Sequence, residues 1–195
     1  YVVVLNATSG AAVRIEELNG VILGQGLTNG SLAVETATEV GVGLVLPWQS
    51  ERCVSVWQGA KQAKGRQRWQ ATALQAAKQA RRARVPEVGE VRDTRRLADW
   101  VRQTVRSGGV VLVLHEEAST PISTAMESVR LPGPGEAPLA LAVVVGPEGG
   151  ISPEETAALE AAGAMTVRLG PHVMRTASAG PVALAVLAHA SGLWE

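Results

Sequence analysis

The sequence predicts an α/β fold in which helices cover a parallel β-sheet. Short apolar runs rich in β-branched residues are typical of strands buried on both faces of such a sheet, and they occur at 42–47, 110–114 and 141–145. Amphipathic stretches of helical period separate these runs. Because strands and helices alternate, the connections are expected to be right-handed crossovers within one sheet.

The first thirty residues are expected to form strands and turns. YVVVLN is rich in β-branched residues, and GVILGQGLTNG is a further apolar run bounded by glycines. Gly24, Gly26 and Gly30 do not have the spacing of a dinucleotide-binding fingerprint. We expect a small β segment at 1–30, too short to fold alone, and one larger domain at 31–195.

The next hundred residues alternate between helices and strands. A helix over 31–40 should end at Gly41, and a buried strand over 42–47 follows. A polar connection rich in Trp and basic residues then leads into an amphipathic helix over 67–84, which Pro86 terminates. Another amphipathic helix is predicted over 93–106, before the strand at 110–114.

Polar residues follow the strand predicted at 110–114, and a glycine-rich turn follows the strand predicted at 141–145. His115, Glu116 and Glu117 stand at the expected carboxyl end of the first of these strands, and residues 118–138 include LPGPGEAP, a predicted surface loop. The strand at 141–145 runs into GPEGG, a turn whose backbone can approach a ligand closely because three of its five residues lack a Cβ.

A helix should begin directly after this first turn. Ser152-Pro153-Glu154-Glu155 is a capping box with proline at the first helical position, and the helix is expected to reach Gly163. A strand over 166–169 then leads to Gly170-Pro171, the second turn, and to a terminal helix rich in Ala and Leu that includes 183–193. Such strand ends and glycine turns bind ligands in open α/β sheets, although each could also be an ordinary connection.

Charge is distributed unevenly along the 195 residues. Residues 51–106 contain 14 of the 18 Lys and Arg but only 5 of the 18 acidic residues, so this segment carries +9 and the remainder −9. One strongly basic segment in a neutral chain indicates a polyanionic partner. The single cysteine, Cys53, fits a reducing compartment, and three scattered histidines do not predict a metal site. Without a signal layout or a long apolar span, we expect a soluble, cytoplasmic protein.

The two turns, GPEGGISPEE at 146–155 and LGPHVMRTASA at 169–179, resemble the hallmark motifs of the RsmE-type small-subunit ribosomal RNA uridine N3-methyltransferases of the SPOUT superfamily. Further matches, in order, are VETATEVG at 34–41, PWQSERCVSVW at 47–57, RW at 68–69, AAKQARRARVPEV at 76–88 and LHEE at 114–117. The resemblance therefore covers roughly residues 31–195.

This resemblance implies a SPOUT-type sheet with a C-terminal trefoil knot, a homodimer, and an N-terminal PUA-like β-barrel that binds RNA. Only about thirty residues precede the methyltransferase part, so the barrel is abbreviated or part of it is missing from this sequence. A second departure is Ala177, where many relatives have a carboxylate.

The activity implied is methylation of N3 of a specific uridine in small-subunit (16S) rRNA, with S-adenosyl-L-methionine as cofactor. The naked rRNA or the assembled small subunit would be the partner. Two alternatives remain open: a SPOUT ribose 2′-O-methyltransferase, and a relative that binds rRNA without catalysis. The residues expected to bind the cofactor are Leu114, Glu116, Gly146, Glu148, Gly150, Ile151, Leu169, Gly170, Val173, Met174, Thr176 and Ser178.

Arg175 is the expected catalytic or substrate-placing residue, since a guanidinium can hold a phosphate or stabilise charge on the uracil ring. It could instead pair structurally with Glu148 or Glu116. Thr176 and Ser178 could bind the cofactor or cap the last helix. Glu116 and Glu148 are candidate proton acceptors, with His115 and His172 as weaker ones.

The basic segment is expected to bind rRNA phosphates, and its tryptophans divide between two roles. Trp48 or Trp57 could stack on a base, whereas Trp69 faces the apolar side of its helix and should be core. The phosphate-binding residues predicted are Arg52, Lys61, Lys64, Arg66, Arg68, Arg81, Arg82 and Arg84.

Overall fold

The computed structural model describes residues 2–7, 30–130, 139–191 and 194. Two predictions fall on other residues. The second apolar run of the N-terminal segment, at 20–30, lies almost entirely outside the described residues, and the predicted surface loop LPGPGEAP lies wholly outside them.

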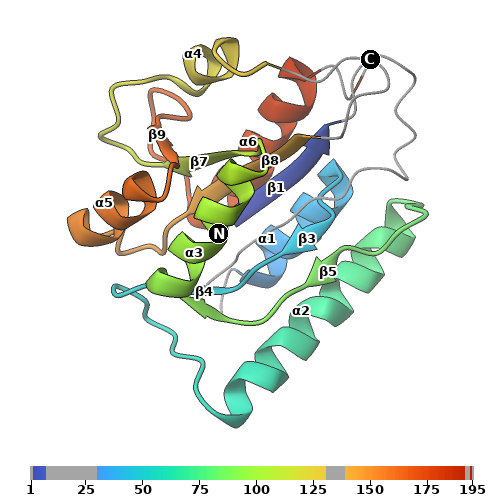
Figure 1. The fold of residues 1–195 in the computed structure, drawn as a ribbon. Coiled ribbons are helices and arrows are strands. Elements are labelled where there is room, and N and C mark those ends of the chain that lie inside the picture. Colours follow the sequence, from blue (N-terminus) through green and yellow to red (C-terminus); the bar gives the residue numbers. More distant parts are fainter. Residues whose placement is uncertain (1, 8–29, 131–138, 192–193, 195) are drawn as a thin grey trace.

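The centre of the fold is a six-stranded sheet with the order β5-β3-β1-β8-β7-β9 (Figure 1). β7 is parallel to both β8 and β9, as predicted, and β3 is parallel to β5, a strand that the sequence did not predict. β1 runs antiparallel to its neighbours β3 and β8, so the sheet is mixed rather than wholly parallel. The strands are β1 (Val2–Ala7), β3 (Leu44–Val45), β5 (Glu87–Val88), β7 (Val110–Leu114), β8 (Leu139–Val145) and β9 (Met165–Val167).

β1 joins the two parallel halves of the sheet. Its register with β8 extends from Val2 opposite Val144 to Ala7 opposite Leu139. The β-rich composition of this stretch predicts a strand, but its two neighbours come from residues 44–45 and 139–145, which local pattern cannot reveal. The division of the chain near residue 30 stays a prediction.

Helices cover both faces of the sheet (Figure 1). α1 and α6 lie on one face, with α2 packed on α1, and α3 and α5 lie on the other. Among the described helices, none has the length and apolar character needed to cross a bilayer. The helices are α1 (Gly30–Val40), α2 (Ala60–Gln79), α3 (Thr94–Arg106), α4 (Ile122–Glu127), α5 (Pro153–Ala161) and α6 (Thr176–Ala190).

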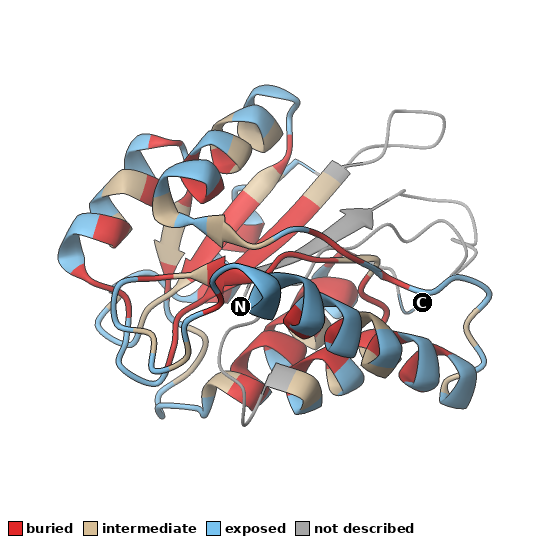
Figure 2. Ribbon diagram, turned by 90° about the horizontal axis from the view of Figure 1, so that it is seen from below, coloured by how far each residue is buried: buried red, intermediate tan, exposed pale blue. Residues whose placement is uncertain are grey.

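Side chains of the central strands alternate between two cores. In β8, Leu141, Val143 and Val145 belong to the core under α1 and α6, whereas Ala142 and Val144 belong to the core under α3 and α5. The apolar runs are continuous because both faces of the sheet are covered. Figure 2 shows the result, with buried residues on the inward helix faces and exposed residues outside.

Several predicted element boundaries are confirmed by capping geometry. The Ser152 hydroxyl accepts from the Glu155 N–H, and the Glu155 carboxylate accepts from the Ser152 N–H, so the predicted capping box starts α5. Asp93 caps α3 in the same way through the Arg96 N–H. Gly163 has φ 103°, a left-handed conformation that favours glycine at the end of a helix.

Three predicted elements were wrong in extent. The helix expected over 67–84 is α2, which begins at Ala60 because Gly65 lets the helix pack against Trp57, where a Cβ would lie 2.6 Å from the indole. It ends at Gln79, and Arg81 has φ 54°. The strand expected over 42–47 is reduced to β3, while β4 (Trp48–Gln49) pairs separately with β6 (Arg92–Asp93). The strand expected over 166–169 is β9, which covers Met165–Val167, and α4 lies in a stretch for which no element was predicted.

Arg82 follows α2, and its guanidinium donates to backbone carbonyls at the end of α1. Its guanidinium Nη1 donates to the carbonyls of Thr38 at 2.9 Å and Val42 at 2.6 Å, and its Nη2 donates to Gly41 at 3.3 Å. These carbonyls lie in the last turn of α1 and just after it, where a helix runs out of backbone donors, although the Thr38 carbonyl also accepts the Gly41 N–H at 3.2 Å. Burial lowers the pKa of Arg82 below its usual value.

Replacing Arg82 by Ala should therefore lower the free energy of unfolding by about 1–3 kcal/mol, because partly buried carbonyls lose their donor. Urea denaturation followed by circular dichroism measures the change. Arg84→Ala, at an exposed position in the same turn region, is the matched control and should change stability by less than about 0.5 kcal/mol. Equal effects of the two variants would contradict the structural role of Arg82.

Candidate functional site

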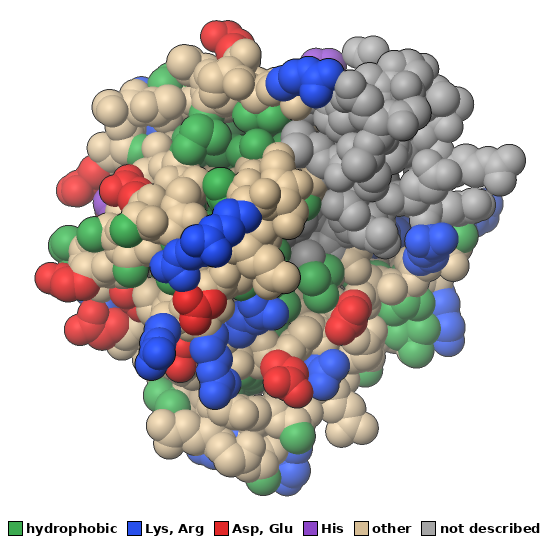
Figure 3. Space-filling model, in the orientation of Figure 1, with side chains coloured by type: hydrophobic (Ala, Val, Ile, Leu, Met, Phe, Trp, Pro, Cys, Tyr) green, Lys and Arg blue, Asp and Glu red, His purple; other side chains and the backbone are tan. Residues whose placement is uncertain are grey.

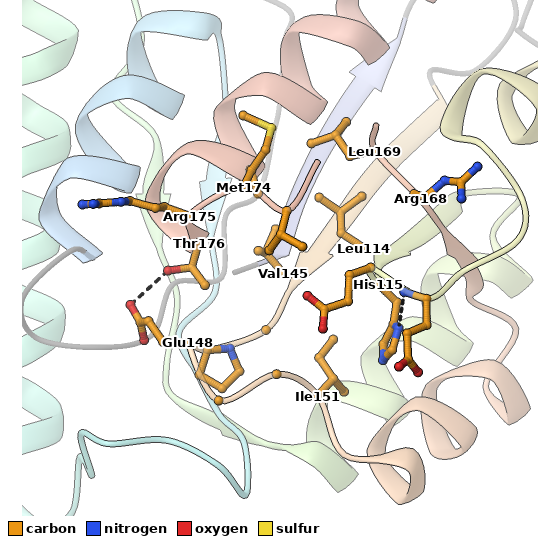
Figure 4. Close-up of a pocket in the computed structure, with 18 of the residues that line it drawn as sticks. Leu114, His115, Val145, Glu148, Ile151, Arg168, Leu169, Met174, Arg175 and Thr176 are labelled. Carbon is orange, nitrogen blue, oxygen red and sulfur yellow. Dashed lines mark hydrogen bonds between the residues drawn. The ribbon is translucent and has the colours of Figure 1, made fainter. Parts of the chain in front are cut away.

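The carboxyl ends of β8, β7 and β9 lie side by side, and the segments that follow them surround one cavity (Figure 4). These segments are 115–117 after β7, 146–151 after β8 and 168–176 after β9. The cavity has a volume of about 830 Å³, within the usual range for small-molecule sites. The two glycine turns singled out in the sequence thus form two walls of the same space.

Of the residues expected to bind a cofactor, Ser178 alone does not line this cavity; it is exposed in the first turn of α6. Arg175, the expected catalytic residue, also lines it. The predicted residues found at the cavity are Leu114, Glu116, Gly146, Glu148, Gly150, Ile151, Leu169, Gly170, Val173, Met174, Arg175 and Thr176.

The first turn is shaped by contacts that need glycine. A Cβ on Gly146 would lie 2.5 Å from the Ile151 side chain, which is itself 5% exposed. Gly150 has φ 76°, and its N–H donates to the Pro147 carbonyl at 2.9 Å. The turn therefore folds back tightly so that α5 can begin at once.

The second turn is open at Gly170 and is tied to the first through Thr176. A Cβ on Gly170 would have no heavy atom within 4 Å, so its backbone borders open space. The Thr176 hydroxyl donates to Glu148 Oε1 at 3.0 Å, the bond drawn in Figure 4. Thr176 thus uses its side chain to join the two turns.

Arg175 makes no ion pair within 4 Å with a described carboxylate. The structural pairing with Glu148 or Glu116, considered from the sequence, is therefore not formed. In Figure 4 the Arg175 side chain is exposed and extends away from Leu114 and Val145. Its guanidinium is available to a ligand that approaches from outside the cavity.

His115 is held by a short local hydrogen bond. Its Nδ1 accepts from the Glu117 backbone N–H at 3.2 Å, as drawn in Figure 4. In the neutral ring the proton therefore resides on Nε2, which makes that nitrogen a donor.

Sequence reasoning missed part of the lining. Arg168, which follows β9, was not predicted, and His172 was suggested only as a weaker proton acceptor; both border the cavity. Arg52 also lines it, although its sequence position is about a hundred residues from the first turn. The motif at 47–57 was a signal for Arg52, but nothing in the pattern indicated which part of the molecule it would reach.

The predicted RNA-binding residues are mostly exposed but do not share one role. Lys61, Lys64 and Arg68 are exposed on α2, and Arg81 and Arg84 follow it. On the face shown in Figure 3, basic side chains gather over α3 with acidic ones between them, and acidic side chains predominate near α5.

Two of the predicted basic residues make structural contacts. Arg66 Nε donates to the Val88 carbonyl at 2.6 Å, although the residue is exposed, and Arg82 holds the end of α1 as described above. The three carbonyls on Arg82 use most of its donors, so its side chain is the least available to a phosphate.

The suggestion that Trp48 or Trp57 stacks on a base is wrong. Trp48 is 0% exposed and Trp57 is 5% exposed, so neither presents a ring face to solvent. The Trp48 indole N–H donates to Thr94 Oγ1 at 3.2 Å. Trp57 packs edge-on against Trp69, with ring centroids 4.9 Å apart, and Trp69 is core as predicted. Within the described residues, no group of three or more His, Cys, Asp or Glu could hold a metal ion.

A helix-covered sheet with a glycine-lined cavity at the carboxyl ends of its parallel strands is the architecture in which α/β proteins bind small ligands. Residues 16–188 match the RNA methyltransferase domain model, and the chain belongs to that family.

The curated relatives of this chain are named as methyltransferases of small-subunit ribosomal RNA. The ribosomal RNA small subunit methyltransferase E of Mycobacterium bovis is 47% identical over 164 residues, covering 84% of this chain and 60% of the relative. The protein of the same name from Bacillus subtilis is 31% identical over 162 residues, covering 82% of this chain and 60% of that protein. The chain thus spans about three fifths of the length of these curated relatives.

A solved structure supports the fold assignment. The ribosomal RNA small subunit methyltransferase E of Neisseria gonorrhoeae, bound to S-adenosyl methionine, has a TM-score of 0.72 and 25% identity to this chain. The match covers 89% of this chain and 65% of that structure.

The two cavity glycines should respond differently to substitution. Gly146→Ala should lower the free energy of unfolding by about 1–3 kcal/mol, because its Cβ would overlap the buried Ile151 side chain. Gly170→Ala should change stability by less than about 0.5 kcal/mol, because its Cβ would enter open space. Urea denaturation measures both, and a more destabilising effect at Gly170 would contradict the described shape of the two turns.

Proposed function

We propose that this chain is an S-adenosylmethionine-dependent methyltransferase that methylates N3 of a uridine in small-subunit rRNA. The observation that carries the proposal is the convergence of both predicted cofactor turns on one cavity, in a chain of the RNA methyltransferase family. The names of the relatives support the rRNA substrate, and the sequence resemblance supports the N3 position.

The residues of the cavity fit such a cofactor. Leu114, Val145 and Ile151 supply apolar surface for an adenine ring, and the glycine turns expose backbone groups that can bond to its edge. Glu116 and Glu148 are carboxylates at the same cavity that suit a cationic amino group. The volume of about 830 Å³ also leaves space for part of a nucleotide.

Bound S-adenosylmethionine would supply an electrophilic methyl group, so the protein has to align the nucleophile and accept a proton from uracil N3. Arg175, exposed at the cavity and without a carboxylate partner among the described residues, suits a phosphate or the charge that develops on the ring. Glu116 is the proposed proton acceptor, since Glu148 already accepts from Thr176 and His115 Nε2 is a donor.

The rRNA would lie on the basic segment, through the exposed cations of α2 and its end together with Arg52. Arg81 supports this assignment in particular. It holds φ 54°, a conformation that favours glycine after a helix, yet the position carries a cationic side chain. Arg82 is left out of the proposed surface because its donors bind α1.

The remaining expectations are part of the same proposal: a C-terminal trefoil knot, a homodimer, a PUA-like segment within 1–30 and a cytoplasmic location. Support for a subunit interface comes from exposed apolar side chains at and near the second turn, namely Val173 (76% exposed), Met174 (37%) and Val182 (38%). Sedimentation equilibrium tests the dimer, and a monomer at all concentrations would contradict it.

Calorimetric titration of S-adenosylmethionine should yield binding to the native chain and at least about a tenfold weaker affinity for Gly170→Trp, a loss of about 1.4 kcal/mol. The position tolerates a side chain sterically, so the indole would fill the cavity rather than unfold the turn. Gln103→Trp, at an exposed position of α3, is the control and should bind like the native chain. Absence of binding to the native chain would overturn the cofactor proposal.

Arg175→Ala should lower kcat/KM for methyl transfer by about 10²–10³-fold with little change in cofactor affinity, as expected when a group that stabilises developing charge is removed. Arg175→Lys should recover only part of this loss, because an ammonium lacks the planar fork. Transfer from labelled cofactor to small ribosomal subunits measures the rates.

Nuclease digestion and mass spectrometry of the nucleosides identify the product of this reaction. N3-methyluridine is expected. A 2′-O-methylated nucleoside would replace the proposal with ribose methylation, and no methylated product alongside RNA binding would indicate a non-catalytic relative.

A further inference from the structure

Arg52 reaches the cavity from a distant part of the chain and lies on its first turn. Its Nη1 donates to the Gly149 carbonyl at 3.4 Å, and a Cβ on Gly149 would lie 3.0 Å from the Arg52 carbonyl oxygen. A Cβ on Gly150 would lie 4.0 Å from the same Nη1. The loop that carries Arg52 is therefore seated directly on the two glycines, and its guanidinium lies beside the cavity.

Glu155 fixes this loop to the first turn. Its carboxylate is 5% exposed, and Oε1 accepts both the Glu51 backbone N–H at 2.9 Å and the Thr94 hydroxyl at 2.6 Å. Oε2 accepts the Ser152 N–H at 3.3 Å as part of the capping box. One buried side chain thus connects the start of α5, the start of α3 and the residue that precedes Arg52.

Gln49 closes the same loop on itself. Its Oε1 accepts the Trp57 backbone N–H at 2.8 Å, and its Nε2 donates to the Ser55 carbonyl at 3.1 Å. Because Trp57 is buried against α2, the far end of the loop is anchored as well. Arg52 is consequently an exposed side chain on a loop that is fixed at both ends.

The charge around Arg52 indicates the ligand. α2 follows this loop and carries Lys61, Lys64 and Arg68 on its exposed surface, so Arg52 continues a basic segment up to the cavity. Its one hydrogen bond to a described residue is the long contact with Gly149, which leaves most of the guanidinium fork for a ligand. A planar fork of donors, exposed at the end of a basic segment, suits an RNA phosphate.

We propose that Arg52 binds a backbone phosphate next to the nucleotide that enters the cavity, and that Glu155 is the positioning residue that holds Arg52 there. This inference rests on the proposed function, since it assigns a specific RNA contact to the same site. It explains why a motif so far from the glycine turns in sequence lies against them in space.

Arg52→Ala is the direct test, with small ribosomal subunits reconstituted from unmodified rRNA transcript as substrate. KM for the subunits should rise by about 10- to 100-fold, the loss expected for one charge-assisted contact, while the dissociation constant of S-adenosylmethionine stays within about twofold. Arg52→Lys should recover part of the affinity. Arg106→Ala removes an exposed charge from the end of α3, away from the cavity, and is the matched control.

Two results would overturn the role of Arg52. Weaker binding of S-adenosylmethionine with unchanged KM for the subunits would assign Arg52 to the carboxylate of the cofactor. Unchanged values of both quantities would remove Arg52 from the site altogether.

The positioning role of Glu155 is tested by combining substitutions. Glu155→Ala removes the acceptor of the Glu51 N–H and should raise KM for the subunits, and adding Arg52→Ala to it should cause little further increase, since both changes remove the same contact. Ser152→Ala, which removes the capping hydroxyl but leaves Glu155, separates the cap from the loop and should lower stability without changing KM. Independent, multiplicative effects of Glu155→Ala and Arg52→Ala would show that Glu155 acts only as a cap.

RNA binding without methyl transfer distinguishes this inference from the proposed function. If the native chain binds no cofactor and transfers no methyl group, the proposed function fails. The contact of Arg52 is then judged by the salt dependence of subunit binding, whose logarithmic slope should fall by about one in Arg52→Ala. An unchanged slope would overturn the phosphate contact.

Discussion

The structure depends on the parallel pairing of β7 with β8 and with β9. This pairing brings the carboxyl ends of three strands to one edge, although the residues that follow them begin at 115, 146 and 168 in the chain. Parallel strands require crossovers, and α5 provides the one between β8 and β9. The cavity is therefore a consequence of strand direction, and its chemistry is decided by the residues placed just after each strand.

Local constraints make the two glycine turns complementary. At the first turn a Cβ on Gly146 would meet Ile151, and Gly150 needs a positive φ, so glycine is required for the chain to fold back. At the second turn Gly170 is surrounded by open space, so glycine there leaves room for a ligand instead. The hydrogen bond between Thr176 and Glu148 Oε1 joins the two turns and occupies one of the two oxygens of that carboxylate.

The basic segment contributes to both structure and function. Arg82 binds three carbonyls at the end of α1, and Arg66 binds the Val88 carbonyl, whereas other cations of the same segment are exposed. Net charge alone could not distinguish a structural arginine from one that binds RNA. An arginine that donates to backbone carbonyls and one that is exposed to a phosphate contribute the same charge to the sequence. Glu155 also has two roles, since its side chain takes part in the cap of α5 and anchors the loop that carries Arg52.

The sequence by itself determined the features whose cause lies within a few residues. It predicted the capping box at Ser152, the buried strands β7 and β8, and the glycine turns that line the cavity. Tertiary structure decided the rest: β1 between β3 and β8, the early start of α2 against Trp57, the burial of Trp48 and the arrival of Arg52 at Gly149. Caps and turns depend on short-range hydrogen bonds and backbone sterics, which a local pattern records. Strand neighbours and the burial of one side chain by another depend on segments that can lie more than a hundred residues apart, as β1 and β8 do, and only the folded chain brings these together.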